Sequence, residues 1–121
     1  DTGHLVFAGA DALRVLDKHG HRINHVHTKD VRADVLARLD RTADSFLDAV
    51  LRGVFTVPGD GMIDFGPLAR RLADLGYEGW FVVEAEQDPA RASPLEYARL
   101  GHRAITQALE QAGYRIEGRS S

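Results

Sequence analysis

The chain has 121 residues, of which 44% are hydrophobic, and this composition is typical of a globular domain and excludes a disordered chain. A net charge of −3 with scattered basic residues gives no positive surface for nucleic acid. No apolar run is long enough to span a membrane, and the lack of cysteine excludes disulfides and thiolate metal sites. We therefore expect a cytoplasmic protein that binds neither nucleic acid nor membranes.

The first half of the chain is predicted to contain helices on either side of one strand. Residues 1–9 are expected to form a loop that leaves a strand lying upstream. Residues 10–19 favour a short helix, and residues 23–28 favour a strand that ends in polar side chains. Residues 33–52 carry a helical apolar stripe, with a polar stretch at 40–45 where the helix is allowed to break.

The second half repeats the pattern of helix, strand and helix. Residues 55–61 contain strong turn signals and are expected to be a loop. A helix is predicted at 65–75 and a second strand at 79–86. The last helix is predicted to start at a capping box in residues 93–96 and to continue to Gly113.

Strands that alternate with helices predict parallel βαβ units. Two strands are too few for a sheet that stands alone, and a complete (β/α)8 barrel takes roughly 250 residues. The expected fold is therefore α/β, with residues 1–121 forming one domain that is the C-terminal part of a larger TIM barrel. About two strands and four helices of that barrel would be present.

Polar side chains gather where the predicted strands end. His27 ends the first strand, Glu84 ends the second, and Asp1 would follow the strand upstream. In a barrel, the C-terminal ends of the strands form the active-site face. Two carboxylates and an imidazole are good ligands for a divalent metal such as Mn, Co, Mg or Zn. A metal site is therefore one interpretation of these three residues.

Ordinary structural roles are the alternative interpretation. Asp1 would serve equally well as a turn or cap residue, and His4 as a solvated loop histidine. His25 is expected to lie deeper in the wall as a structural interior histidine. Lys29 and Asp30 would then be an exposed ion pair, which contributes little to stability.

Glu84 has the strongest case for a function among the candidate residues. It would face inward from a strand whose other face is apolar, and a carboxylate in packed surroundings needs a partner. Glu86 and Asp88 are expected to lie nearer the rim. The turn at 58–61 is expected to be a plain turn that does not contact substrate.

Several stretches of the chain resemble the closing third of the xylose-isomerase-like TIM barrels, a superfamily of sugar isomerases, epimerases and inositol-catabolism enzymes. They are Asp1-Thr-Gly-His4, His25-Val-His-Thr-Lys-Asp30, Val57-Pro-Gly-Asp-Gly-Met-Ile-Asp-Phe65 and Gly79-Trp-Phe-Val-Val-Glu84. Two further stretches are similar to the inosose dehydratases of that superfamily, namely Glu84-Ala-Glu-Gln-Asp-Pro89 and Pro94-Leu-Glu-Tyr-Ala-Arg-Leu-Gly101. The resemblance extends to about Gly113 and implies that residues 1–121 are the C-terminal third of a barrel.

The resemblance implies a metal held by a Glu, an Asp, a His and a second Glu on successive strands. The last three match Asp1, His27 and Glu84, whereas the first Glu would lie upstream and has no match. The histidine that contacts substrate in the family matches His4. An Arg that often does the same has Arg32 as its nearest candidate, although the spacing differs.

The implied enzyme is a hydro-lyase of myo-inositol catabolism. It would remove water from a small-molecule polyol ketone, 2-keto-myo-inositol, through an enediolate-type intermediate. Glu84 or the upstream Glu would take the α-proton, and His4 or Lys29 would protonate the leaving hydroxyl. Lys29 is also a candidate substrate-binding residue. Mn or Co is the expected metal, with Mg or Zn as alternatives, and participation of a thiol such as glutathione stays open.

Three other functions stay open at the level of sequence. The first is a sugar isomerase or epimerase of the same superfamily, which abstracts a proton without losing water. The second is a zinc phosphodiesterase acting on damaged DNA, which the charge of −3 disfavours. The third is an inactive barrel fragment. Taken alone, the chain is expected to be metal-poor, inactive and prone to associate through an exposed sheet edge, so a homo-oligomer is among the expected partners.

Overall fold

The computed structural model describes residues 1–117. Within them lie six α-helices and one 3-10 helix, namely α1 (Thr2–Phe7), α2 (Ala12–His19), η1 (Gly20–Arg22), α3 (Ala33–Arg38), α4 (Phe46–Leu51), α5 (Phe65–Asp74) and α6 (Pro94–Gln111). The strands of the same part are β1 (Val26–Thr28), β2 (Asp30–Val31), β3 (Phe55–Thr56) and β4 (Phe81–Val83). The α/β character is confirmed, although the elements are shorter and more numerous than the two strands and four helices expected.

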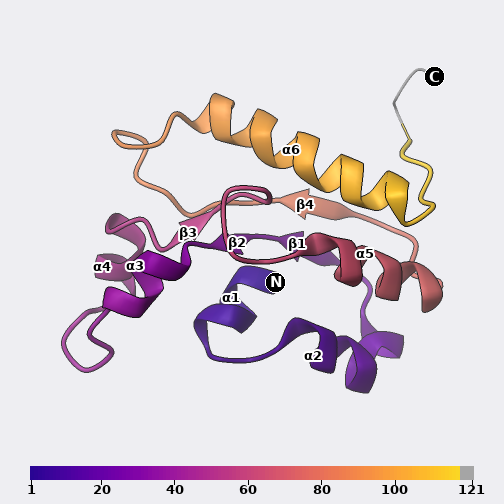
Figure 1. Ribbon diagram of the computed structural model, residues 1–121, viewed down its shortest axis with the longest axis horizontal. Helices are drawn as coiled ribbons and strands as arrows, with labels where there is room; N and C mark the ends of the chain where they lie inside the picture. Colours follow the sequence, from indigo (N-terminus) through magenta and orange to yellow (C-terminus); the bar gives the residue numbers. More distant parts are fainter. Residues whose placement is uncertain (118–121) are drawn as a thin grey trace.

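Strands β1 and β4 form a parallel pair, as predicted for strands of a barrel. Val26 lies opposite Phe81 and Thr28 lies opposite Val83, so the two strands end side by side. Helix α6 covers one side of this pair, whereas α1 and α2 lie on the other side (Figure 1). The residues that directly follow β1 and β4 therefore lie next to one another at the same edge of the strand pair.

Strands β2 and β3 form a second, antiparallel pair that the sequence does not predict. Residues 55–61 are expected to be a loop, yet Phe55 and Thr56 lie opposite Val31 and Asp30. All four of these residues are buried, and the burial of apolar Val31 and Phe55 stabilises a strand pair that is only two residues long. The turn signals of the segment are real, but they begin only after Thr56.

The main hydrophobic core lies between the parallel strand pair and helices α2, α5 and α6. Apolar residues on these helices recur at intervals of three and four residues, as Leu68 and Leu72 do in α5, so each helix presents an apolar face. The buried members of this core are Ala12, Leu16, Val26, Phe65, Leu68, Ala69, Leu72, Tyr77, Ile105 and Leu109. This packing fixes β1 and β4 against the helices.

A second, smaller core joins β2 and β3 to α1 and α4. Its buried members are Val31, Ala49, Val54 and Phe55, and side chains of α1 pack against them. The Phe55 ring also lies 5.2 Å from the His4 ring, centroid to centroid, and 5.2 Å from the Lys29 ammonium. The smaller core is therefore continuous with a group of polar residues.

The expectation of a loop at residues 1–9 is wrong, because helix α1 occupies most of it. The Asp1 side chain accepts a hydrogen bond of 2.8 Å from the backbone N–H of His4 and so caps the helix. A helix of six residues is too short to show a recognisable apolar period. It forms here because it packs against β1 and β2.

The helix predicted at 33–52 does break where its polar stretch allows. Helix α3 ends at Arg38, and α4 starts at Phe46 behind a capping box of Ser45 and Asp48. The capping box predicted at 93–96 is wrong, because the Ser93 side chain makes no hydrogen bond to the start of α6. Pro94 at that start instead removes one unpaired N–H group.

The helices in residues 1–117 all fall short of the length and apolar character that crossing a membrane requires.

Candidate active site

The structure brings Asp1, His27 and Glu84 together from three separate places in the chain. Asp1 caps α1, His27 lies in β1, and Glu84 directly follows β4. The His27 Nδ1 atom lies 2.5 Å from the Glu84 Oε2 atom and 3.9 Å from the Asp1 Oδ2 atom. One ligand atom from each residue falls within 4.8 Å of the others. Two carboxylate oxygens and one imidazole nitrogen at this separation fit a divalent metal ion.

The two oxygens of Asp1 have different tasks. Oδ1 accepts the hydrogen bond from the His4 N–H, whereas Oδ2 lies 3.5 Å from the Lys29 ammonium and faces His27. The cap holds the carboxylate in one orientation and leaves the second oxygen to the site. The role of a helix cap and the role of a ligand are therefore compatible in this residue.

Lys29 is buried at the centre of the group, with 0% of its side chain exposed. Its Nζ atom lies 3.0 Å from Glu86 Oε2, 3.4 Å from Glu84 Oε1 and 3.5 Å from Asp1 Oδ2. A buried charge is tolerated only where opposite charges compensate it, and here three carboxylates do so. The expected exposed pair of Lys29 with Asp30 is wrong, because both residues are buried and the cation turns to other carboxylates.

His4 stands beside Lys29 on the more open side of the group. Its Nε2 atom lies 3.1 Å from Glu86 Oε2 and 3.4 Å from the Lys29 Nζ atom, and its Nδ1 atom lies 3.5 Å from Asp1 Oδ2. Phe46 and Phe55 flank the ring, which keeps 44% of its side chain exposed. His4 therefore combines a fixed orientation with access for a ligand.

Glu86 is a member of the group that sequence reasoning placed at the rim. Burial by itself would raise the pKa of this carboxyl, but hydrogen bonds and charge from Lys29 and His4 outweigh burial and lower the pKa below its ordinary value. The signal was present in the sequence, because Glu84 and Glu86 are two residues apart in an extended segment and share a face. We call these six residues the polar cluster: Asp1, His4, His27, Lys29, Glu84 and Glu86.

Arg32 is not brought into the polar cluster by the structure. In the described part of the chain its guanidinium donates to the Gly53 carbonyl oxygen at 2.8 Å, to Asp60 Oδ2 at 2.8 Å and to the Tyr97 hydroxyl at 3.3 Å. These bonds connect β2 with the turn after β3 and with α6. Its donors are thus engaged in joining structural elements.

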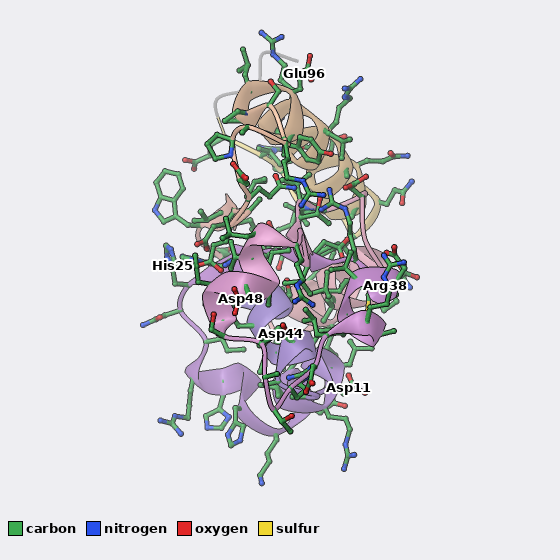
Figure 2. The ribbon with its side chains drawn as sticks, turned by 90° about the vertical axis from the view of Figure 1, so that its left-hand side faces the viewer. Asp11, His25, Arg38, Asp44, Asp48 and Glu96 are labelled. Carbon is green, nitrogen blue, oxygen red and sulfur yellow. The ribbon has the colours of Figure 1, made fainter. Side chains whose placement is uncertain are left out.

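His25 lies outside the polar cluster as well. It is exposed and points outward at the edge of the molecule, so the expectation of an interior position is wrong (Figure 2). It precedes β1, where the chain has not yet entered the sheet, and its ring packs edge-on against the His27 ring, with centroids 5.3 Å apart.

The buried carboxylate of Asp30 binds the backbone just after the turn at 58–61. The Oδ1 atom of Asp30 accepts hydrogen bonds from the backbone N–H groups of Val31 at 2.7 Å and Ile63 at 2.9 Å. Gly61 passes so close that a Cβ atom there would clash with the same carboxylate. Burial raises the pKa of Asp30, and its Oδ2 atom has no hydrogen-bond partner in residues 1–117.

An apolar cavity of about 440 Å³ borders the polar cluster at Asp1, His4 and His27. The rest of its lining comes mainly from side chains of the main core, such as Leu16 and Phe65. Hydroxyl groups placed in such a cavity would lose their hydrogen bonds to water without replacement. A polar ligand would therefore bind at the cluster and not in the cavity beside it.

Comparison with known protein families identifies the class to which this architecture belongs. Residues 1–115 match the family described as Xylose isomerase-like TIM barrel, and the chain belongs to this family. The relatives it resembles include the inosose dehydratase of Geobacillus thermodenitrificans (strain NG80-2), which is 64% identical over 98 residues. That match covers 81% of this chain and 33% of the relative.

Two further relatives give the same picture. The inosose dehydratase of Clostridium tetani (strain Massachusetts / E88) is 61% identical over 98 residues, which is 81% of this chain and 33% of the relative. The rhizopine catabolism protein MocC of Rhizobium meliloti is 53% identical over 117 residues, which is 96% of this chain and 36% of the relative. The chain thus spans about a third of the length of the curated relatives it matches.

Proposed function

We propose that this chain supplies part of the active site of a hydro-lyase that removes water from 2-keto-myo-inositol in myo-inositol catabolism. The observation that carries the proposal is the convergence of Asp1, His27 and Glu84 at the C-terminal ends of the parallel strands β1 and β4. That end of the strands is where barrel enzymes place their chemistry. Identities of 61% and 64% to two inosose dehydratases support the choice of substrate.

Asp1, His27 and Glu84 would hold a divalent metal ion, with Mn or Co expected first and Mg or Zn as alternatives. Such an ion, when bound, polarises a ketone and makes the adjacent C–H more acidic. The chain's part is to fix the donors in one orientation. The N-cap of α1 does this for Asp1, and the pairing of β1 with β4 does it for His27 and Glu84.

The proton transfers are assigned to residues of the polar cluster. Glu84 accepts the α-proton, and the electron pair of the C–H bond forms the carbon–carbon double bond of an enediolate-type intermediate. The intermediate then reforms the ketone C=O and makes a carbon–carbon double bond to the next carbon, whose hydroxyl takes a proton from His4 and leaves as water. The resulting enol tautomerises to the cyclic dione. His4 suits this role because its ring is partly exposed, whereas the enclosed Lys29 side chain has no exposed surface from which to donate a proton.

The other properties of the enzyme are proposals of the same kind. We place it in the cytoplasm, with a small polyol ketone as its partner and with neither nucleic acid nor membrane. We also propose that the enzyme forms a homo-oligomer and that a thiol such as glutathione takes part in the reaction. Measuring the mass of the purified protein in solution and its turnover with and without the thiol tests both. The 121 residues alone are expected to be inactive, since they span about a third of the relatives' length.

The decisive experiment is an ultraviolet assay with 2-keto-myo-inositol, because the dione product absorbs in the ultraviolet and the substrate does not. It uses the whole protein, including any part that extends beyond these residues, before and after a chelator and after addition of Mn or Co. Dione formation that the chelator abolishes and the metal restores is expected. No turnover by a protein verified as folded would reject the dehydratase. Product analysis would then look for an isomerised or epimerised sugar.

A further inference from the structure

The side-chain charges of the polar cluster leave room for one divalent cation. Three carboxylates, on Asp1, Glu84 and Glu86, surround the single ammonium group of Lys29, so these four side chains together carry a net charge of −2. Two of these carboxylates belong to the proposed metal ligands, and the following inference therefore rests on the proposed function. The third, Glu86, is not among the grouped ligand atoms.

Lys29 is a potential competitor of the metal. Its Nζ atom lies 3.4 Å from Glu84 Oε1 and 3.5 Å from Asp1 Oδ2, and each of these residues also offers an oxygen to the proposed ion. An ammonium group that moved closer to them would occupy the oxygens and repel a dication. The closest carboxylate is instead Glu86, whose Oε2 atom lies 3.0 Å from the Nζ atom.

The ammonium group cannot escape this competition by turning to solvent. The whole side chain is buried, and its stem runs so close to Gly3 that a Cβ atom there would lie 2.7 Å from the Lys29 Cγ atom. The Phe55 ring closes another side at 5.2 Å from the Nζ atom. The charge of Lys29 must therefore be compensated where it stands.

We propose that Glu86 is a positioning residue that draws the Lys29 ammonium away from the metal-ligand oxygens and so raises the affinity of the site for a divalent cation. The same Oε2 atom lies 3.1 Å from His4 Nε2, which orients the carboxylate between the two nitrogen groups. Partners that act through the ligands in this way change metal affinity by roughly 10–100-fold. Glu86 acts through Lys29, so its effect depends on the presence of that ammonium group.

The test is a double-mutant cycle read out as the dissociation constant for Mn, measured by calorimetry on the whole protein. The variants are Glu86→Gln, Lys29→Met and the double variant. Glu86→Gln is expected to weaken Mn binding by roughly 10–100-fold when Lys29 is present. In the Lys29→Met background the same change is expected to alter affinity by no more than about twofold, the scatter of independent sites.

Three outcomes would overturn the inference, and they differ in what else they reject. Equal weakening in both backgrounds would make Glu86 a direct ligand, and no weakening with Lys29 present would make it dispensable. In both cases the proposed metal site would survive. A wild-type protein that binds no Mn would reject the metal site together with the inference.

Two controls keep the cycle interpretable. Circular dichroism and thermal unfolding verify that each variant folds, and Lys29→Gln replaces Lys29→Met if the methionine variant does not. Glu96→Gln removes a carboxylate that is exposed near the start of α6 (Figure 2) and is expected to leave Mn affinity unchanged.

Discussion

Lys29 and Arg32 are two cations in one short stretch of chain, yet the structure uses them in opposite ways. Lys29 is enclosed by the carboxylates of the polar cluster, the closest at 3.0 Å. Arg32 turns to the Gly53 carbonyl oxygen and to Asp60, each at 2.8 Å. Both residues are close in sequence to the proposed ligand His27, so sequence position alone does not show which of the two belongs to the polar cluster.

The difference lies in what already satisfies the donors of each side chain. The guanidinium of Arg32 donates to four partners: the carbonyl oxygens of Gly53 and Phe55, the Asp60 carboxylate and the Tyr97 hydroxyl. The ammonium of Lys29 is placed among groups that would also face substrate and metal. We therefore expect changes at Lys29 to alter chemistry and metal binding as well as stability, and changes at Arg32 to alter stability alone.

The largest effect is expected at the proposed base beside Lys29. Glu84→Gln keeps the shape of the side chain but removes the group that accepts the α-proton, so turnover should fall by roughly 10²–10⁴-fold in the ultraviolet assay. Glu96→Gln, which makes the same change at an exposed residue of α6, is the matched control and should leave turnover unchanged. Full activity of the glutamine variant would show that the base is elsewhere.

Loss of the Lys29 ammonium is expected to lower the free energy of unfolding by about 2–4 kcal/mol, because removal of one partner leaves buried charges uncompensated. This loss is smaller than for a fully buried ion pair, because the Glu84 and Glu86 side chains are 34% and 35% exposed. Denaturant unfolding of Lys29→Met measures it. A variant as stable as wild type would mean that water compensates the carboxylates.

Gly61→Ala tests the close packing of the turn at 58–61 against Asp30, the residue that follows Lys29. The added Cβ atom would meet the Asp30 carboxylate and the Val31 carbonyl oxygen, so we expect a loss of about 1–3 kcal/mol in unfolding free energy. Gly20→Ala is the comparison, because its Cβ would meet only the end of the Leu75 side chain, which can turn away. Equal losses in both variants would contradict this account.

Arg32→Met separates a structural role from the substrate-binding role expected from sequence. We expect the unfolding free energy to fall by about 1–2 kcal/mol, because charged hydrogen bonds are lost at a partly exposed site. The dissociation constant for Mn and the KM for 2-keto-myo-inositol should not change. A raised KM with unchanged stability would instead establish Arg32 as a substrate ligand.

The smallest effect is expected from Asp30, which lies between Lys29 and Arg32 in sequence. Its pKa is raised by burial in the folded state, so the folded protein binds the proton more tightly than the unfolded chain. Stability contributed by this group is therefore gained as pH falls and lost as pH rises from the ordinary aspartate pKa through the folded value.

Asp30→Asn should remove this part of the pH dependence. Denaturant unfolding of both proteins over the same pH range measures it, and the stability difference between variant and wild type should shift in favour of the variant as pH rises. A difference that stays constant with pH would show that Asp30 keeps the same proton affinity in the folded and unfolded chain.

Much of the fold follows from patterns that a single sequence displays. The apolar stripes of α2, α5 and α6 and the two strands of the parallel pair are visible because each element buries one face. Helix α1 and the β2–β3 pair are not visible, because they are too short to carry a period. They exist because tertiary packing around Phe55 and Val31 stabilises them.

The candidate site is only partly readable from sequence. Glu84 could be singled out because a carboxylate ends an apolar strand, and the same alternation extends to Glu86. The burial of Lys29 was not readable, since it depends on Gly3 and Phe55, which come from distant parts of the chain. Sequence patterns indicate which residues can do chemistry, whereas packing decides which charges meet.

The exposed connection between α3 and α4 divides the polar cluster unevenly. A cut within residues 40–45 would leave Asp1 and every nitrogen group of the cluster, including Lys29, on one piece, and both Glu84 and Glu86 on the other. The first piece would hold the Lys29 ammonium with the Asp1 carboxylate, whereas the second would hold two carboxylates and no cation of the cluster. The ion pairs of Lys29 with Glu84 and Glu86 would therefore form only where the two pieces associate, so the groups that we assign to chemistry depend on both halves of the chain.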